Sequence, residues 1–134
     1  MKAYNAKDIR NIAIAGHSGR GKTTLAEAML FLAKATDRLG RVADGNTVLD
    51  FDAEEKRRKV TIATAMAAFD WNNTKINLLD TPGLFDFAGG VSEGMRAAES
   101  ALIVLAAGSG VDVGAEKAYK AASERKIAKL FAVT

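Results

Sequence analysis

Residues 16–23 constrain the fold more than any other part of the sequence. Their sequence is GHSGRGKT, which fits the pattern G-x-x-x-x-G-K-[S/T] without deviation. The apolar run 9–16 before it is typical of a buried strand, and residues 22–35 after it carry apolar side chains at helical spacing. A strand that enters a glycine-rich turn and leaves it as a helix is the context in which this pattern binds phosphate groups. The sequence therefore predicts a phosphate-binding loop.

The chemistry of phosphate explains why these residue types are needed. Glycines let successive backbone N–H groups point inward, and the helix N-terminus adds partial positive charge. Lys22 can reach the β- and γ-phosphates, and the Thr23 hydroxyl can bind Mg²⁺. His17, the only histidine, is expected to have a structural or hydrogen-bonding role. The expected phosphate-binding residues are Gly16, His17, Ser18, Gly19, Arg20, Gly21, Lys22, Thr23 and Thr24.

A second motif, DTPG at residues 80–83, ends the expected strand 75–80. Asp80 is placed to hold Mg²⁺ through a water molecule, Thr81 and Pro82 form the turn, and the Gly83 N–H is free to bond a γ-phosphate. Upstream, the segment RRKVTI contains Thr61 at the start of the next expected strand. Its hydroxyl could close over the nucleotide as a further Mg²⁺ ligand, or it could be an ordinary strand threonine.

The order of the remaining elements indicates an α/β domain. Strands alternate with helices, so we expect a P-loop NTPase three-layer sandwich with a mostly parallel sheet and one antiparallel hairpin strand. The Asn-Asn pair before residue 74 predicts the hairpin turn. Residues 36–59 show no period and are expected to be a mobile connection, whose charge run EEKRRK is either a solvated loop or an RNA contact. The further expected strands are 60–69, 101–107 and 129–133, and the further expected helices are 92–100 and 114–126.

Length and composition exclude several classes of protein. A chain of 134 residues forms one domain around a single core. Because it has no cysteine and one histidine, disulfides and thiolate or histidine-rich metal sites are excluded. The net charge of +3 favours anionic partners only mildly. No apolar run approaches the ~20 residues of a membrane span, so a cytoplasmic location is expected. We expect no membrane or DNA partner.

Taken together, four segments resemble the N-terminal GTP-binding domain of bacterial elongation factor G, and most closely its divergent elongation-factor-G-like paralogues. They are GHSGRGKTTLAEAMLF, VTIATA, INLLDTPGLFDF and VLAAGSGVDVGAEKAYKAASERKI. The resemblance covers essentially the whole chain. It implies a GTPase that binds GTP or GDP with Mg²⁺ and couples nucleotide state to movement on the ribosome. It also implies catalytic roles for Lys22, Thr61 and Gly83, and Mg²⁺ ligation by Thr23, Thr61 and Asp80.

The sequence departs from this family at three places. The usual loop is G-H-V-D-x-G-K-T, and Ser18 and Gly19 replace its Val-Asp pair. The lost aspartate puts any accessory cation in doubt. Lys59 replaces the glycine of R-G-I-T-I in the first switch. Leu84 replaces the histidine of D-T-P-G-H in the second switch, and that histidine positions the attacking water.

Leucine can neither donate nor accept a hydrogen bond, so Leu84 leaves two alternatives open. In the first, hydrolysis is slow and depends on a partner, because most phosphoryl-transfer catalysis is electrostatic. In the second, the chain is a nucleotide-gated binding module with little or no turnover. An ATP-dependent enzyme on the same loop is a third class, which the joint presence of DTPG and Thr61 disfavours.

The last expected strand, 129–133, should be an interior strand of the sheet, and the chain stops directly after it at Thr134. The family's base-reading motif N-K-x-D would follow Thr134, so guanine preference is inferred from resemblance alone. We therefore expect residues 1–134 to be a C-terminally truncated fragment of a GTP-binding domain, monomeric, with weak nucleotide affinity and no useful catalysis.

Overall fold

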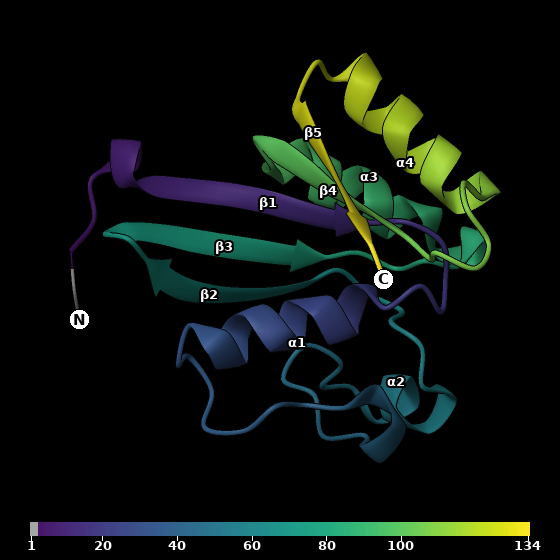
Figure 1. Ribbon diagram of the computed structural model, residues 1–134, viewed down its shortest axis with the longest axis horizontal. Coiled ribbons are helices and arrows are strands. Elements are labelled where there is room, and N and C mark those ends of the chain that lie inside the picture. The colour runs from purple at the N-terminus through teal and green to yellow at the C-terminus, as the bar shows by residue number, and fades with distance from the viewer. Residues whose placement is uncertain (1–2) are drawn as a thin grey trace.

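A mixed five-stranded sheet forms the centre of the molecule. The computed structural model describes residues 3–134 (Figure 1). The strands lie in the order β2-β3-β1-β4-β5; β2 is antiparallel to β3, and all other neighbours are parallel. The predicted α/β class, with a mostly parallel sheet and one antiparallel hairpin strand, is confirmed. The strands are β1 (Ile9–Ala15), β2 (Ala65–Trp71), β3 (Thr74–Asp80), β4 (Ser100–Leu105) and β5 (Ala128–Val133).

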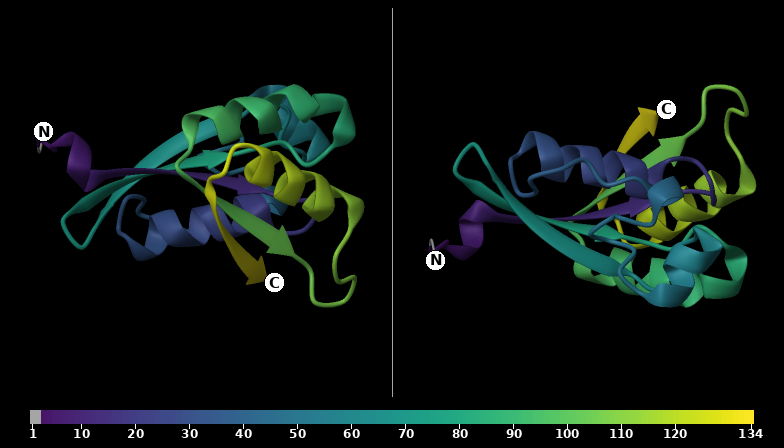
Figure 2. Two further views of the ribbon diagram at one scale, coloured as in Figure 1. Left: turned by 90° about the horizontal axis from the view of Figure 1, so that it is seen from above. Right: turned by 90° about the horizontal axis from the view of Figure 1, so that it is seen from below.

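Helices cover both faces of this sheet, which gives the three expected layers. Helix α1 lies on one face, and α3 and α4 lie together on the other (Figure 2). The short helix α2 belongs to the long segment between α1 and β2. The helices are α1 (Lys22–Leu32), α2 (Ala53–Arg58), α3 (Ala88–Ala97) and α4 (Val113–Glu124), and the 3₁₀ turns are η1 (Ala6–Asp8), η2 (Val42–Asp44) and η3 (Phe85–Phe87).

The core is divided by the sheet, and the alternation of side chains along each strand decides which half a residue joins. In β1, Ala13 and Ala15 pack under α3 and α4, whereas Ile14 packs under α1. In β4, Ile103 belongs to the half of the core under α3 and α4, and Leu102 belongs to the half under α1. Both halves are buried, as predicted from the continuously apolar β4.

The prediction was wrong about the segment between α1 and β2. Residues 60–64 were expected to begin a strand, but β2 starts at Ala65. The preceding stretch was expected to lack structure, yet it contains η2 and α2. Helix α2 forms because Asp52 and Glu55 make a capping box, in which each side chain accepts a hydrogen bond from the other end of the first turn.

The predicted hairpin turn is confirmed, and the last strand lies at an edge of the sheet. Asn72 and Asn73 adopt left-handed φ angles of 47° and 62°, as the tight turn between β2 and β3 requires. Among the described residues β5 is one of the two edge strands of the sheet, and its place in a longer domain stays a prediction.

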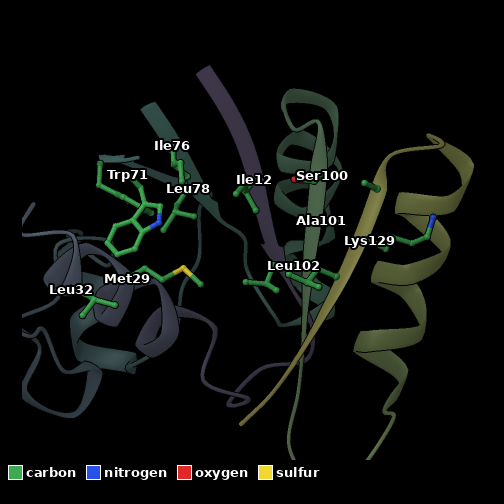
Figure 3. Close-up of a pocket in the computed structure, with 13 residues that line it drawn as sticks. Ile12, Met29, Leu32, Trp71, Ile76, Leu78, Ser100, Ala101, Leu102 and Lys129 are labelled. Atoms are coloured by element: carbon green, nitrogen blue, oxygen red, sulfur yellow. The ribbon is translucent and has the colours of Figure 1, made fainter. Parts of the chain in front are cut away.

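An apolar cavity of about 440 Å³ lies on the α1 side of the sheet. Met29 and Leu32 of α1 and Ile12 and Leu102 of the sheet lie around it (Figure 3). It is also lined by the first residues of β4 and β5, whereas the glycine-rich loop follows the last residue of β1. The cavity is therefore remote from the predicted site. Within residues 3–134, no helix combines the length and the apolar character needed to cross a bilayer.

Candidate phosphate and metal site

The loop between β1 and α1 has the glycine-dependent shape that the motif predicts. Gly16 has φ of 141°, and a Cβ atom there would lie 2.6 Å from the Val104 carbonyl oxygen. Gly21 precedes α1 with a left-handed φ of 81°. Side chains at either position would collide or strain the backbone. The loop therefore curls tightly between β4 and the first turn of α1.

Beside this loop is a cavity of about 180 Å³, called here the phosphate cavity. Three segments that are distant in the sequence form its walls: the glycine-rich loop, the segment between α1 and β2, and the turn after β3. It is lined by Ser18, Gly19, Gly21, Lys22, Thr23, Thr24, Val42, Asp50, Lys59, Val60, Thr61 and Gly83. The structure therefore brings Thr61 and Gly83 to the predicted loop.

Lys22 lies at the base of the cavity with its side chain largely buried. Its Nζ donates a 3.0 Å hydrogen bond to the His17 carbonyl. Burial lowers the pKa of Lys22, and the nearby carboxylate of Asp80 opposes that shift. A cation held in a low-dielectric loop attracts an anion more strongly than one in water. The position of Lys22 suits the binding of phosphate oxygens.

Gly83 lies against the same loop. The Ser18 N–H donates to the Gly83 carbonyl at 3.1 Å, and a Cβ atom at residue 83 would lie 2.6 Å from the Ser18 nitrogen and against the Lys22 ammonium. Only glycine allows this approach without displacement. The second motif therefore lies directly on the phosphate loop, as predicted.

Four side-chain oxygens form a continuous buried cluster next to the cavity. Thr23 Oγ1 donates to Asp80 Oδ2 at 2.6 Å and lies 3.1 Å from Thr61 Oγ1. Thr61 Oγ1 in turn donates to Asp50 Oδ1 at 2.8 Å. The three residues expected to hold Mg²⁺ are thus in contact, and Asp50 joins them.

The electrostatics of this cluster fit a divalent cation. Asp80 Oδ1 is buried and has no hydrogen-bond partner within the described part of the chain. Burial raises the pKa of Asp80 to about 7, although the Thr23 hydrogen bond and Lys22 act against the rise. Burial also raises the pKa of Asp50. An adjacent cation would favour both charged forms, and hard oxygen ligands are those that Mg²⁺ prefers.

Other predicted residues support the site without lining the cavity. Thr81 is buried, and its hydroxyl and its N–H both donate to the Ile14 carbonyl, which ties the turn to β1. Pro82 packs against Gly90, since a Cβ atom there would lie 2.8 Å from Pro82 Cδ. Arg20 Nε pairs at 3.0 Å with Asp112, the N-cap of α4.

Leu84 lines a different cavity, of about 260 Å³, between the second motif and the helices α3 and α4. The next residue, Phe85, packs against His17 with ring centroids 5.6 Å apart, and Lys117 Nζ lies 4.0 Å from the Phe85 ring centroid. Leu84 does not line the phosphate cavity. In this conformation Leu84 is partly exposed and borders the cavity beside α3 and α4.

Four acidic or basic residues at or near the site were not among the site residues expected from the sequence. Glu27 of α1 is fully buried and accepts from the N–H groups of Val48 and Leu49. Asp50, Glu55 and Lys59 complete the set. The D-x-x-E spacing of the capping box could have identified Glu55. Nothing local identifies Asp50 or Glu27, because their partners are distant in the sequence.

Comparison with known proteins agrees with this geometry. A model of the family described as "Elongation factor Tu GTP binding domain" matches residues 7–134. An elongation factor G-like protein of Mycobacterium tuberculosis is 41% identical over 126 residues, which are 94% of this chain and 18% of that protein. The mitochondrial ribosome-releasing factor 2 of Yarrowia lipolytica is 43% identical over 131 residues, 95% of this chain and 16% of that protein.

A solved structure gives the same result in three dimensions. A crystal structure of a protein from Thermus thermophilus superposes with a TM-score of 0.91 at 38% identity, covering 93% of this chain and 19% of that one. The chain thus spans less than a fifth of the length of these relatives. On the family match across nearly its whole length, the chain belongs to the elongation factor Tu GTP-binding domain family.

Proposed function

We propose that this chain binds GTP and GDP with Mg²⁺ and hydrolyses GTP in a cycle linked to the ribosome, as part of an elongation-factor-G-like GTPase. The observation that carries the proposal is the contact between Thr23, Asp80 and Thr61 beside the cavity that contains Lys22. These residues come from three separate segments, and their meeting is what a metal-bound polyphosphate requires.

Each residue then has a definite task. The loop amides and Lys22 bind the phosphates, and the Gly83 carbonyl must leave the Ser18 N–H before that amide can do so. Thr23, Thr61 and Asp80 would hold Mg²⁺. When bound, Mg²⁺ neutralises charge on the phosphate oxygens. Gly83 supplies an N–H to the terminal phosphate.

Hydrolysis without a histidine at residue 84 is expected to be slow and dependent on a partner. Loss of one group that positions water typically costs ~10²–10⁴-fold in rate. The test is Leu84→His in the intact protein, with Leu84→Met as the control for packing against α3 and α4. A rise of orders of magnitude in ribosome-stimulated turnover for Leu84→His alone supports the proposal. If both variants match the wild type, the water is ordered elsewhere.

The proposed partner is the ribosome, in line with the name of the ribosome-releasing relative. Increasing concentrations of ribosomes should accelerate GTP turnover by the intact protein to a plateau. A rate that stays flat while GTP binding is intact would favour the second candidate, a nucleotide-gated module without turnover, which Leu84 motivates. The cytoplasmic location stays a prediction, since one relative is named as mitochondrial.

The proposal includes a preference for guanine, and no residue of this sequence is direct evidence for that preference. Competition between GTP and ATP for the intact protein tests it directly, and tighter ATP binding would overturn the assignment. For residues 1–134 alone we expect weak affinity, because no base-recognition motif is present in the sequence. Micromolar or tighter GTP binding by this segment, measured by calorimetry, would contradict that expectation.

A further inference from the structure

Lys59 is a second lysine at the phosphate cavity, and neither of the two phosphate motifs includes it. It lines the cavity together with Lys22, Thr61 and Gly83. Its side chain is exposed, and no described residue forms an ion pair or hydrogen bond with its ammonium group. An unpaired cation at the edge of an anion-binding cavity is available to a ligand.

The neighbouring basic residues differ from Lys59 in this respect. Arg57 and Arg58 both pair with Glu54 on the exposed side of α2. Neither lines the phosphate cavity. Within this short basic run, only Lys59 both borders the cavity and lacks a carboxylate partner among the described residues. Lys59 is therefore the residue of the run that is available to a ligand in the cavity.

The backbone holds Lys59 at the cavity. Lys59 ends α2 in a left-handed conformation with φ of 55°, and its N–H donates to the Glu55 carbonyl. The Glu55 side chain accepts from the N–H groups of Ile62 and Ala63 on the other side of the turn. Left-handed φ is unfavourable for lysine and free of strain for glycine. This turn holds the backbone of Lys59 directly before Val60 and Thr61, which also line the cavity.

The charge of the cavity also differs from the family pattern described above. That pattern has aspartate at the position of Gly19 and glycine at the position of Lys59, and both residues line the cavity here. One negative charge is lost and one positive charge is gained at the same place. Lys59 thus adds a positive charge to the lining of the cavity, and Gly19 adds none.

We propose that the Lys59 ammonium binds the terminal phosphate of a nucleoside triphosphate. This inference rests on the proposed function, since it concerns the same site. Gly83 is the group proposed to meet the γ-phosphate, Thr61 is the Mg²⁺ ligand two residues after Lys59, and both line the same cavity as Lys59. A diphosphate lacks that group. Lys59 thus distinguishes the triphosphate from the diphosphate.

The test compares Lys59→Gly with Lys59→Arg in the intact protein. Glycine keeps the left-handed turn and removes the charge, whereas arginine keeps the charge. Lys59→Gly should weaken binding of a non-hydrolysable GTP analogue by roughly 5- to 50-fold, as expected for one screened charge contact, and binding of GDP by less than about 3-fold. Lys59→Arg should keep most of the wild-type preference for the GTP analogue over GDP. The matched control is Arg58→Ala, which should change neither affinity.

The outcomes separate this inference from the proposed function. Lys22→Ala should abolish binding of both nucleotides if the cavity is the phosphate site. If Lys22→Ala does so and Lys59→Gly leaves the ratio of GTP-analogue to GDP affinity unchanged, the role of Lys59 is refuted while the function stands. An equal loss of both affinities in Lys59→Gly would refute it as well. If the wild type binds neither nucleotide, the function itself fails.

Discussion

Glu55 is expected to hold the segment that carries Thr61, and replacing it by alanine tests this. Glu55 is buried, and its Oε1 accepts from the Ile62 and Ala63 amides at 2.9 and 3.2 Å. Its Oε2 accepts from the Asp52 N–H at 3.2 Å in the capping box. Glu55→Ala removes the acceptor for all of these amides. Thr61, next to Ile62, should then lose its fixed place beside Thr23.

The magnitude follows from those hydrogen bonds. A buried donor left without a partner costs about 1–3 kcal/mol. Local opening lets water reach the amides, so the combined effect should stay near about 2–4 kcal/mol rather than the full sum. If the closed segment is needed for the triphosphate, each ~1.4 kcal/mol of lost closure lowers the apparent affinity about tenfold. We therefore expect roughly 30- to 1,000-fold weaker binding of a GTP analogue and little change for GDP.

Hydrogen exchange of the amides in residues 60–64 reports the closure directly, and nucleotide titration reports its consequence. Glu55→Ala should lose protection at Ile62 and Ala63. Glu54→Ala is the control, because the Glu54 side chain is partly exposed and only pairs with Arg57 and Arg58, so its loss should cost below about 1 kcal/mol. Unchanged protection in Glu55→Ala would refute the reasoning.

Two further predictions concern how α4 docks on the loop and can be checked by urea unfolding. Gly114→Ala should destabilise the fold by about 1–3 kcal/mol, because the new Cβ would lie 2.5 Å from His17 Cα, whereas Gly89→Ala, with nothing within 4 Å, should stabilise it by about 0.5–1 kcal/mol. Equal effects would contradict the docking. Asp112→Ala removes both the N-cap of α4 and the pair with Arg20, so it should cost about 1–2 kcal/mol, against less than about 1 kcal/mol for Arg20→Ala. A larger effect of Arg20→Ala would reverse that assignment.

The sequence was sufficient where structure depends on local spacing. The phosphate loop, the Asn72–Asn73 turn and the alternation of strands with helices each follow from residue types a few positions apart. The contact of Asp80 with Thr23 could also be anticipated, because both motifs follow strands that turn out to be parallel neighbours, and the carboxyl ends of such strands share one edge of the sheet.

Local sequence patterns were not sufficient to predict the structure of residues 60–64. The run from Val60 to Thr64 has strand-forming residues. However, the Ile62 and Ala63 N–H groups donate to the Glu55 side chain, and the Thr61 hydroxyl donates to Asp50. Tertiary hydrogen bonds therefore override strand propensity there. The position of Lys59 at the cavity depends on the same fold of the segment, so neither its exposure nor its left-handed turn could be predicted from its neighbours.

The central claim is that Thr23, Thr61 and Asp80 form a Mg²⁺ site next to phosphates held by Lys22. The most direct measurement is the affinity of the intact protein for a GTP analogue with and without Mg²⁺, compared between wild type and Thr23→Ala. We predict that Mg²⁺ strengthens binding by the wild type and that Thr23→Ala loses this gain while keeping the metal-independent affinity that Lys22 supplies. Full Mg²⁺ dependence in Thr23→Ala, or none in the wild type, would contradict the account.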